Sequence, residues 1–425
     1  MTNISNSTNS SHDYKFVIIG AGPAGVVAAE TLSDHGAGGS ILLIGGENEP
    51  PYSRMAIPYL LVENIDEAGT YLRKEDHYYE SKGIDIIHSR VMKTDAAAKT
   101  LTLDNGNVIA YEKLCVATGS HPIKPPIQGL DLPNIHHCWT LEDSRNIAQR
   151  ATKGAKVVLM GAGFIGCIIL EALAERDVHL TVVEMGDRMV PRMLDSTCGN
   201  LIKTWCAQKG VDVETSTKIN QVKQGKNGLE IDLDNGSTLE ADLLVVAAGV
   251  KPNADCVADT GIKIAQGIHV DDYMESSVPD IYAIGDVAEV RDFSIDQWSV
   301  HAIQPVAVDH ARIAALNMLG KRTKYQGSLG LNVLDTLGLI SASFGKWDGV
   351  EGGQQAIRLD ADQFRYTRLE FQDDVLIGAQ TLGRTDHIGV IRGLIQNRIP
   401  LGEWKDKLIE DPNLIMNAYV DITHV

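Results

Sequence analysis

The motif Gly-x-Gly-x-x-Gly occurs twice in this chain, and each copy lies between a short apolar run and a stretch of good helix formers. This arrangement predicts a buried parallel strand, a tight turn and the start of a helix. The free N–H groups and the positive end of such a helix can hold a pyrophosphate. The sequence therefore predicts two dinucleotide-binding units. The cofactor-binding residues predicted in these turns are Gly20, Gly22, Pro23, Ala24 and Gly25 in the first unit and Gly161, Gly163, Phe164, Ile165 and Gly166 in the second.

The two units resemble each other well beyond these motifs. A second apolar run follows each motif, and an acidic residue comes after it: Glu47 in the first unit and Glu184 in the second. At this position a carboxylate accepts hydrogen bonds from an adenosine ribose. Further along, residues 100–119 align without gaps on residues 230–249, and each segment reads as strand, Asp-Asn-Gly turn, strand and buried strand. The chain thus contains two copies of one nucleotide-binding design.

Charge and hydropathy exclude several classes of partner. The formal net charge is −18, and such a surface repels the phosphates of nucleic acid. No apolar run approaches the roughly 18 residues that a membrane-spanning helix needs, so we expect no membrane partner. Residues 1–12 are rich in Asn, Ser and Thr, lack the features of a secretion signal, and are expected to form a disordered tail. We expect a cytoplasmic protein.

Neither the cysteines nor the histidines are spaced as metal ligands or as a catalytic pair. We therefore expect scattered reduced thiols, no metal site and no catalytic acid or base. The cysteines are Cys115, Cys138, Cys167, Cys198, Cys206 and Cys256, and the histidines considered as proton donors are His121, His136, His137, His301 and His310.

The order of these segments predicts an α/β fold with two Rossmann-like domains and a separate C-terminal α+β domain. Residues 13–122 and 250–322 would form the first domain, residues 123–249 the second, and residues 323–425 the C-terminal domain. The last of these carries an alternating pattern on both sides of a Gln-Asp-Asp turn, which predicts an antiparallel hairpin followed by a helix.

The residues taken together resemble the FAD-dependent pyridine nucleotide:disulfide oxidoreductase superfamily. The resemblance implies that the first unit binds FAD, that the second binds NAD(P)H, and that the C-terminal domain forms a homodimer interface. It also implies that two further turns complete the FAD site and that Asp286 bonds the ribitol and pyrophosphate end of FAD. Those turns are Ala117-Thr118-Gly119 and Gly285-Asp286, and Gly249 closes the second unit.

An insertion after Glu47 bears on the electron acceptor. The branch that includes NADH oxidase and coenzyme A-disulfide reductase has a redox cysteine there, whereas this chain has Met55, whose thioether cannot form a thiolate. In the branch that resembles rubredoxin and ferredoxin reductases and the flavin domain of nitrite reductase, the insertion reads Pro-Tyr-x-Arg. Residues 51–54 fit that form, and Arg54 is expected beside the FAD phosphate or the flavin ring, unless it is an ordinary surface arginine.

The resemblance therefore favours an NADH-dependent reductase of a small electron-carrier protein. An NADH oxidase or peroxide or disulfide reductase without the usual cysteine remains an alternative, as does a relay or docking subunit of a larger complex. One departure is that a Lys/Glu pair of many carrier reductases is missing, since Tyr59 and Ile168 occupy those positions.

Three further expectations concern the cofactors. A carboxylate at Glu184 repels a 2′-phosphate, so we expect NADH to be preferred over NADPH, although Arg188 could oppose that preference. Hydride transfer between nicotinamide and flavin is chemistry that the cofactors carry. The helix that begins at Gln304 is expected near the flavin pyrimidine edge, with Trp298 filling a domain interface.

Overall fold

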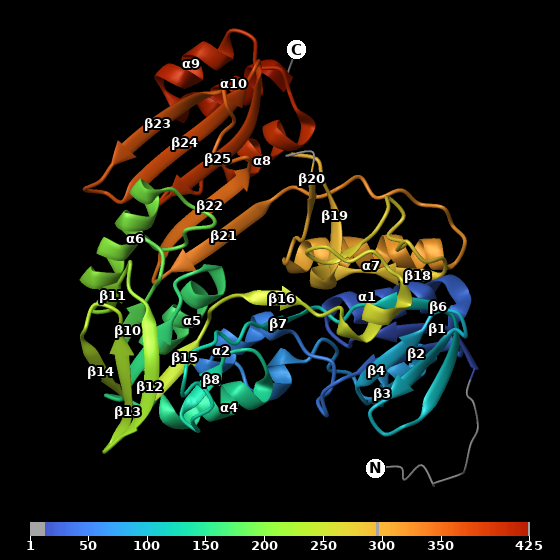
Figure 1. The fold of residues 1–425 in the computed structure, drawn as a ribbon. Coiled ribbons are helices and arrows are strands. Elements are labelled where there is room, and N and C mark those ends of the chain that lie inside the picture. The colour runs from blue at the N-terminus through green and yellow to red at the C-terminus, as the bar shows by residue number, and fades with distance from the viewer. Residues whose placement is uncertain (1–12, 295–296, 424–425) are drawn as a thin grey trace.

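The computed structural model describes residues 13–294 and 297–423, so the tail predicted at residues 1–12 lies outside the described part. Figure 1 shows three groups of elements: one around β1 at the lower right, one around β10 at the left, and the C-terminal sheet above both. Within the described residues, no helix has the length and apolar character needed to cross a bilayer.

The first sheet is built on apolar strands that are buried from end to end, as expected for a parallel sheet covered on both faces. Its order is β3-β2-β1-β6-β5-β4, and β18 pairs with the second half of β6. Helices α1 and α7 pack against each other on this sheet (Figure 1). The elements are β1 (Asp13–Ile19), α1 (Pro23–Leu32), β2 (Ile41–Gly45), α3 (Tyr78–Ser81), β3 (Ile84–His88), β4 (Val91–Asp95), β5 (Thr100–Leu103), β6 (Val108–Val116), β18 (Ile281–Ala283) and α7 (Gln304–Met318).

The second sheet repeats the design in the middle of the chain. Its order is β11-β10-β9-β15-β8, with all neighbours parallel. An antiparallel sheet, β12-β13-β14, lies beside it. The elements are β8 (Ile135–His137), α4 (Leu141–Arg150), β9 (Lys156–Met160), α5 (Phe164–Ala174), β10 (His179–Val183), α6 (Ser196–Gln208), β11 (Asp212–Glu214), β12 (Ile219–Gly225), β13 (Gly228–Leu233), β14 (Thr238–Ala241) and β15 (Leu243–Val246).

The two chain crossings between these sheets pair with each other: β7 (Ser120–Pro122) runs antiparallel to β16 (Val250–Pro252). The returning chain then forms β17 (Ile268–His269), β19 (Ala288–Asp292) and β20 (Gln297–Ser299).

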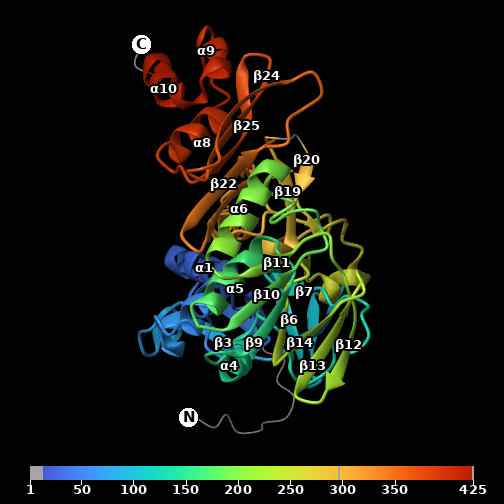
Figure 2. The ribbon, with the colours of Figure 1, turned by 90° about the vertical axis from the view of Figure 1, so that its left-hand side faces the viewer.

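The C-terminal sheet is antiparallel, in the order β21-β22-β25-β24-β23, with helices on one face. Figure 2 shows α6 standing next to β22, so the middle of the chain reaches up to this sheet. The elements are β21 (Leu331–Thr336), β22 (Leu339–Gly345), β23 (Gln354–Asp360), β24 (Arg365–Gln372), β25 (Val375–Leu382), α8 (Ile388–Asn397), α9 (Trp404–Glu410) and α10 (Ile415–Thr423).

The predicted α/β class is confirmed, and so is the C-terminal hairpin, which is β24 and β25. The duplication is visible in three dimensions, since β5 and β6 pair antiparallel as β13 and β14 do. The helix after the second motif begins at Phe164, directly after Gly163, which serves as its N-cap. The limits of the three domains stay a prediction.

Candidate functional site

The first glycine turn forms a cradle that faces open space. Gly20 has a φ of +113°, and a Cβ there would lie 2.2 Å from the carbonyl oxygen of Ala117. A Cβ on Gly25 would lie 1.8 Å from the oxygen of Gly20, so neither glycine tolerates a side chain. Gly22, in contrast, has nothing within 4 Å of its Cβ position, and it caps α1 without a side-chain hydrogen bond. The N–H groups at the start of α1 are therefore free for an anion.

The second glycine turn has the same geometry. Gly161 has a φ of +102°, and a Cβ there would lie 2.5 Å from the oxygen of Ala247. A Cβ on Gly166 would lie 2.2 Å from the oxygen of Gly161, whereas Gly163 again faces open space. Ala247 thus corresponds to Ala117 in the first unit. Both turns fit the pyrophosphate of a dinucleotide.

The predicted residues Glu47 and Arg54 form an ion pair beside the first cradle. Arg54 Nη2 lies 2.7 Å from Glu47 Oε1, and the Tyr52 hydroxyl donates to Glu47 Oε2 over 2.7 Å. Burial lowers the pKa of Arg54, but the nearby Tyr52 and Glu47 outweigh it and leave the pKa raised. Nε of Arg54 is buried without a hydrogen-bond partner among the described residues, and the guanidinium carbon lies 5.2 Å from the ring centroid of Trp139. Arg54 thus combines an ion pair with an aromatic neighbour, and its contact with FAD stays a prediction.

Asp286 lies close enough to this ion pair for the charge of Arg54 to act on it. The Ser120 hydroxyl donates to Asp286 Oδ2 over 3.0 Å. Burial raises the pKa of Asp286, and the Ser120 hydrogen bond and the charge of Arg54 oppose that rise. A Cβ on Gly285 would lie 3.2 Å from Cβ of Ala24, so the Gly285-Asp286 turn sits against the first turn of α1. The structure thus brings the first cradle, Arg54 and Asp286 together.

The Ala117-Thr118-Gly119 turn is hydrogen-bonded to the chain segment that returns from the second sheet. The Thr118 hydroxyl donates to the oxygen of Asn253 over 2.6 Å, and the N–H of Asn253 donates back to the oxygen of Gly119 over 2.9 Å. These bonds fix the crossing between the two sheets. Gly249, in the matching turn of the second unit, has a φ of +104° and only the side chain of Ile123 near its Cβ position.

Glu184 is held in place by the backbone of the second unit. It is 8% exposed, and its two oxygens accept hydrogen bonds from the N–H groups of Ala162 and Gly186, each over 2.6 Å. Arg188 does not face it as a free cation. Its guanidinium donates to the oxygens of Leu194 and Pro191 and pairs with Asp187. The guanidinium of Arg188 thus binds groups of its own loop.

The insertion joins the two units. Helix α2 (Ile57–Leu61) packs against α4 and α5. Arg145 on α4 pairs with Glu49 over 2.8 Å and with Glu67 over 2.7 Å, and Arg176 donates to the oxygen of Leu61. The two cradles are therefore held in one relative position.

The thiols of this chain are poorly suited to redox attack. Met55 is 50% exposed, and the insertion around it, residues 50–60, contains no cysteine. Burial raises the pKa of Cys138 and Cys206 to about 12 and that of Cys256 to about 11. The pKa values of the other cysteines are raised for the same reason; these are Cys115, Cys167 and Cys198. At the positions of the missing pair, Tyr59 is 59% exposed and Ile168 is half-buried.

Sequence reasoning considered His310 only as a possible proton donor and did not single out Trp139. His310 is fully buried on α7 and accepts a hydrogen bond from the N–H of Gly285. Trp298 is 38% exposed and packs on His269, with 3.8 Å between the ring centroids. Its place in a domain interface stays a prediction. No local signal marks His310 or Trp139, because each acts through a contact distant in the sequence. The described residues hold no group of side chains suited to a metal ion.

Comparison with known proteins now places the chain. The family model for pyridine nucleotide-disulphide oxidoreductases matches residues 14–309. The chain belongs to this family. The pyridine nucleotide-disulphide oxidoreductases are FAD- and NAD(H)-binding enzymes, which agrees with the two cradles.

Members of the family that resemble this chain include proteins with different partners. The chain is 29% identical over 401 residues to the NADH-dependent phenylglyoxylate dehydrogenase subunit epsilon of Aromatoleum evansii, covering 94% of this chain and 95% of that one. It is 26% identical over 389 residues to the rubredoxin-NAD(+) reductase of Pseudomonas putida, covering 89% and 98%. The fold matches the reductase in the covalent putidaredoxin reductase–putidaredoxin complex with a TM-score of 0.88, 22% identity and coverage of 97% and 99%.

Proposed function

We propose that this chain is an FAD-dependent oxidoreductase that accepts electrons from NADH and passes them to a small protein electron carrier of the rubredoxin or ferredoxin type. One observation carries the proposal: the chain has two matching cradles but Met55 where a redox cysteine would stand, and every cysteine has a raised pKa. Without a thiolate, disulfide and peroxide substrates lose their usual point of attack. The rubredoxin-NAD(+) reductase among the relatives supports a protein carrier.

The first cradle and its neighbours would hold FAD, which when bound supplies the conversion between hydride and single-electron transfer. The N–H groups at the start of α1 would bind its pyrophosphate, and Asp286 would accept from a hydroxyl of the ribitol. Arg54 would place a positive charge beside the phosphate or the flavin ring. Glu47 keeps a free lone pair on each oxygen for a ribose hydroxyl while Arg54 and Tyr52 hold it in place.

The second cradle would hold NADH. The N–H groups at the start of α5 would bind the pyrophosphate, and Phe164 and Ile165 form the first turn of that helix. Glu184 would accept a hydrogen bond from the adenosine ribose and would repel the extra phosphate of NADPH. Since Arg188 is committed to Leu194, Pro191 and Asp187, it would not reverse this preference.

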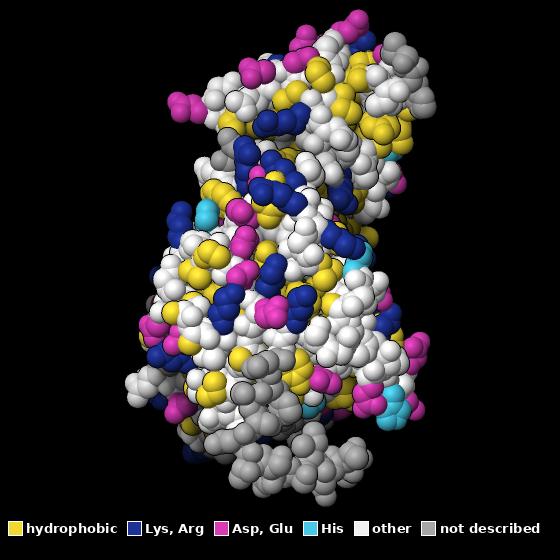
Figure 3. All heavy atoms as spheres, turned by 90° about the vertical axis from the view of Figure 1, so that its right-hand side faces the viewer, with side chains coloured by type: hydrophobic (Ala, Val, Ile, Leu, Met, Phe, Trp, Pro, Cys, Tyr) yellow, Lys and Arg dark blue, Asp and Glu magenta, His cyan; other side chains and the backbone are white. Residues whose placement is uncertain are grey.

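The face on the right of Figure 1 is a candidate surface for a carrier with acidic groups. Figure 3 shows Lys and Arg side chains across the middle of that face, with Asp and Glu side chains among them, although the net charge of the chain is −18. Opposite charges of this kind speed up association and make it sensitive to salt. The homodimer and the cytoplasmic location expected from the sequence stay predictions.

A second candidate is a relay subunit within a larger NADH-linked complex. It is favoured by the relative from Aromatoleum evansii, a subunit by name, which matches this chain over nearly the whole of both lengths. In that case the carrier would be another subunit, and the chain would still use both cradles.

Spectroscopy and turnover test the proposal together. The purified protein should take up FAD, and NADH should bleach its absorbance without producing the long-wavelength charge-transfer band of an active thiolate. Rapid NADH turnover with ferricyanide but slow turnover with oxygen is the expected result. A protein that takes up no FAD on reconstitution contradicts the proposal, whereas fast turnover with oxygen would make it an oxidase.

A further inference from the structure

The loop of residues 186–194, which follows Glu184, is hydrogen-bonded to the second cradle. The N–H of Val190 donates to the oxygen of Ala162 over 2.8 Å, while the N–H of Ala162 donates to Glu184. The backbone N–H and the backbone oxygen of Ala162, the middle residue of Gly161-Ala162-Gly163, thus both bind the segment that starts at Glu184. The position of the 186–194 loop therefore sets the position of the cradle.

The loop is internally rigid. Arg188 donates to the oxygens of Leu194 and Pro191, as described above. Val190 has a φ of +50° and is buried, as are Met189 and Leu194. A non-glycine residue is held in that conformation only when its surroundings fix it. A displacement at the far end of the loop should accordingly be transmitted to Glu184.

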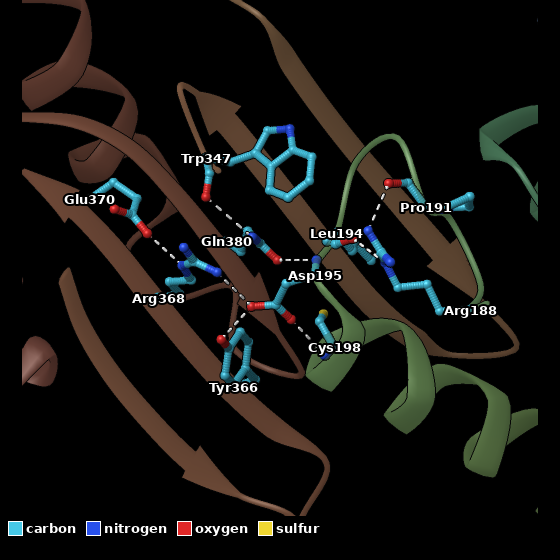
Figure 4. A network of polar contacts seen from close by, with 10 residues as sticks. All are labelled: Arg188, Pro191, Leu194, Asp195, Cys198, Trp347, Tyr366, Arg368, Glu370 and Gln380. Atoms are coloured by element: carbon cyan, nitrogen blue, oxygen red, sulfur yellow. Dashed lines mark hydrogen bonds and ion pairs between the residues drawn. The ribbon is translucent and has the colours of Figure 1, made fainter. Parts of the chain in front are cut away.

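That far end is anchored to the C-terminal sheet (Figure 4). Asp195, directly after the loop, caps α6 through the N–H of Cys198 at 2.9 Å. Its other oxygen accepts from the Tyr366 hydroxyl over 2.5 Å and from Arg368 over 3.2 Å, both on β24. The N–H of Asp195 donates to Oε1 of Gln380 on β25 over 2.9 Å.

These anchoring groups are shielded from water. Gln380 is fully buried and Tyr366 is 2% exposed, and Arg368 also pairs with the buried Glu370 over 2.5 Å. Burial, followed by the hydrogen bond to Asp195, raises the pKa of Tyr366 well above its usual range. Hydrogen bonds of this kind to a charged group are stronger and better defined than solvent-exposed ones.

We propose that the C-terminal domain is part of the NADH site: Tyr366, Arg368 and Gln380 act through Asp195 as positioning residues that hold the 186–194 loop, and with it Glu184 and the second cradle, in the form that binds the adenosine half of NADH. This inference rests on the proposed function. None of the three side chains is expected to touch NADH itself.

The test compares Tyr366→Phe and Gln380→Met with the wild-type holoprotein. Each variant removes one contact to Asp195 from a different strand, and Gln380→Met also removes the hydrogen bond from Gln380 Nε2 to the oxygen of Trp347. Tyr14→Phe is the matched control, because the Tyr14 hydroxyl also donates to an aspartate, Asp85, over 2.9 Å, but in the first sheet. ADP-ribose, titrated calorimetrically, reports the adenosine site alone. Ferricyanide turnover gives the KM for NADH and the kcat, and the flavin midpoint potential shows whether the FAD site has changed. Thermal unfolding shows whether each variant is folded.

We expect the Kd for ADP-ribose and the KM for NADH to rise about three- to tenfold in both test variants, as for the loss of one hydrogen bond to a held group. The kcat at saturating NADH and the flavin potential should stay at the wild-type values, and Tyr14→Phe should match wild type throughout. Unchanged ADP-ribose affinity in both folded variants overturns the inference, as does a shift in flavin potential. A wild-type holoprotein that binds no ADP-ribose overturns the proposed function instead, and this inference with it.

Discussion

The backbone N–H of Gly285 donates a hydrogen bond to Nδ1 of His310 over 3.3 Å. The accepting nitrogen carries no proton, so the proton of the neutral ring is on Nε2, which has no hydrogen-bond partner among the described residues. The ring of Tyr325 lies 4.9 Å away at an interplanar angle of 89°. Helix α7 therefore holds the Gly285-Asp286 turn through an imidazole that must stay neutral.

This contact predicts a pH dependence of stability. Burial, together with the charge of His301, lowers the pKa of His310 to about 3, whereas in the unfolded chain it is about 6.5. The unfolded state therefore binds the proton first as the pH falls. The contribution of His310 is complete above about pH 6.5 and is lost toward pH 3, by about 1.4 kcal/mol per pH unit.

Urea unfolding of wild type and His310→Gln measures that dependence. The glutamine oxygen can still accept from the N–H of Gly285 but does not titrate. Between pH 6.5 and pH 5, wild type should lose about 2 kcal/mol more free energy of unfolding than the variant. Parallel losses in the two proteins would show that His310 is not the titrating group.

Substitutions in the two glycine turns should affect the binding of FAD and of NADH separately. Gly22→Ala and Gly163→Ala add a methyl group where nothing lies within 4 Å, so both proteins should fold. The added methyl group occupies the cradle, so Gly22→Ala should lose FAD, whereas Gly163→Ala should keep FAD and bind NADH at least about tenfold more weakly. Flavin absorbance after gel filtration and titration with NADH measure the two effects.

Two further glycine substitutions serve as controls for the cofactor-binding experiment. Gly389→Ala lies in α8, also with nothing within 4 Å, and should leave both affinities unchanged. Gly20→Ala should fail to fold, because its Cβ would meet the oxygen of Ala117. Loss of FAD from Gly163→Ala would mean that FAD binds at the second cradle or depends on both cradles.

Local patterns in the sequence were sufficient to predict the cradles, because a Gly-x-Gly-x-x-Gly turn depends on residues close together in the chain. Glu184 was identified for the same reason, since it follows the end of a strand, whereas the role of Asp286 was implied by the resemblance to the family. The partners of Asp286 and Gly285 could not be identified, because Ser120 and His310 reach them across the fold. The same limit applies to Asp195, whose side chain caps α6 next to it in the chain but also anchors the C-terminal sheet.

Replacement of Arg54 should affect FAD binding more than stability. Its side chain is 37% exposed and pairs with Glu47, and a partly exposed ion pair contributes at most about 1 kcal/mol to folding. Arg54→Gln should therefore unfold close to the wild-type temperature yet release FAD at a lower denaturant concentration. Lys153→Gln, which breaks an exposed pair with Asp177, is the matched control and should change neither property. Equal FAD affinity in Arg54→Gln and wild type would rule out a contact of Arg54 with the cofactor.

The raised thiol pKa values predict resistance to alkylation. Cys256 has the lowest of the values, about 11, so only about one thiol in ten thousand is a thiolate at pH 7. Iodoacetamide should modify the native holoprotein slowly and leave ferricyanide turnover unchanged. The same reagent in urea should label the six cysteines, as mass spectrometry can show. Rapid loss of activity that follows the labelling of one cysteine would point to a thiol mechanism.

Glu184 is expected to set the choice between NADH and NADPH. Its carboxylate is buried and held by two N–H groups, so it cannot turn away from a 2′-phosphate, and like charges forced together cost several kcal/mol. Wild type should therefore show a kcat/KM for NADH at least about a hundredfold above that for NADPH. Glu184→Gln removes the charge and should narrow this ratio, because the repulsion of the 2′-phosphate of NADPH is lost. The backbone N–H group that then lacks an acceptor should weaken the binding of both nucleotides alike. Glu240→Gln removes an exposed charge from β14 and should leave the ratio unchanged. A wild-type enzyme that prefers NADPH would mean that Glu184 does not face the ribose, whatever the rest of the cradle does.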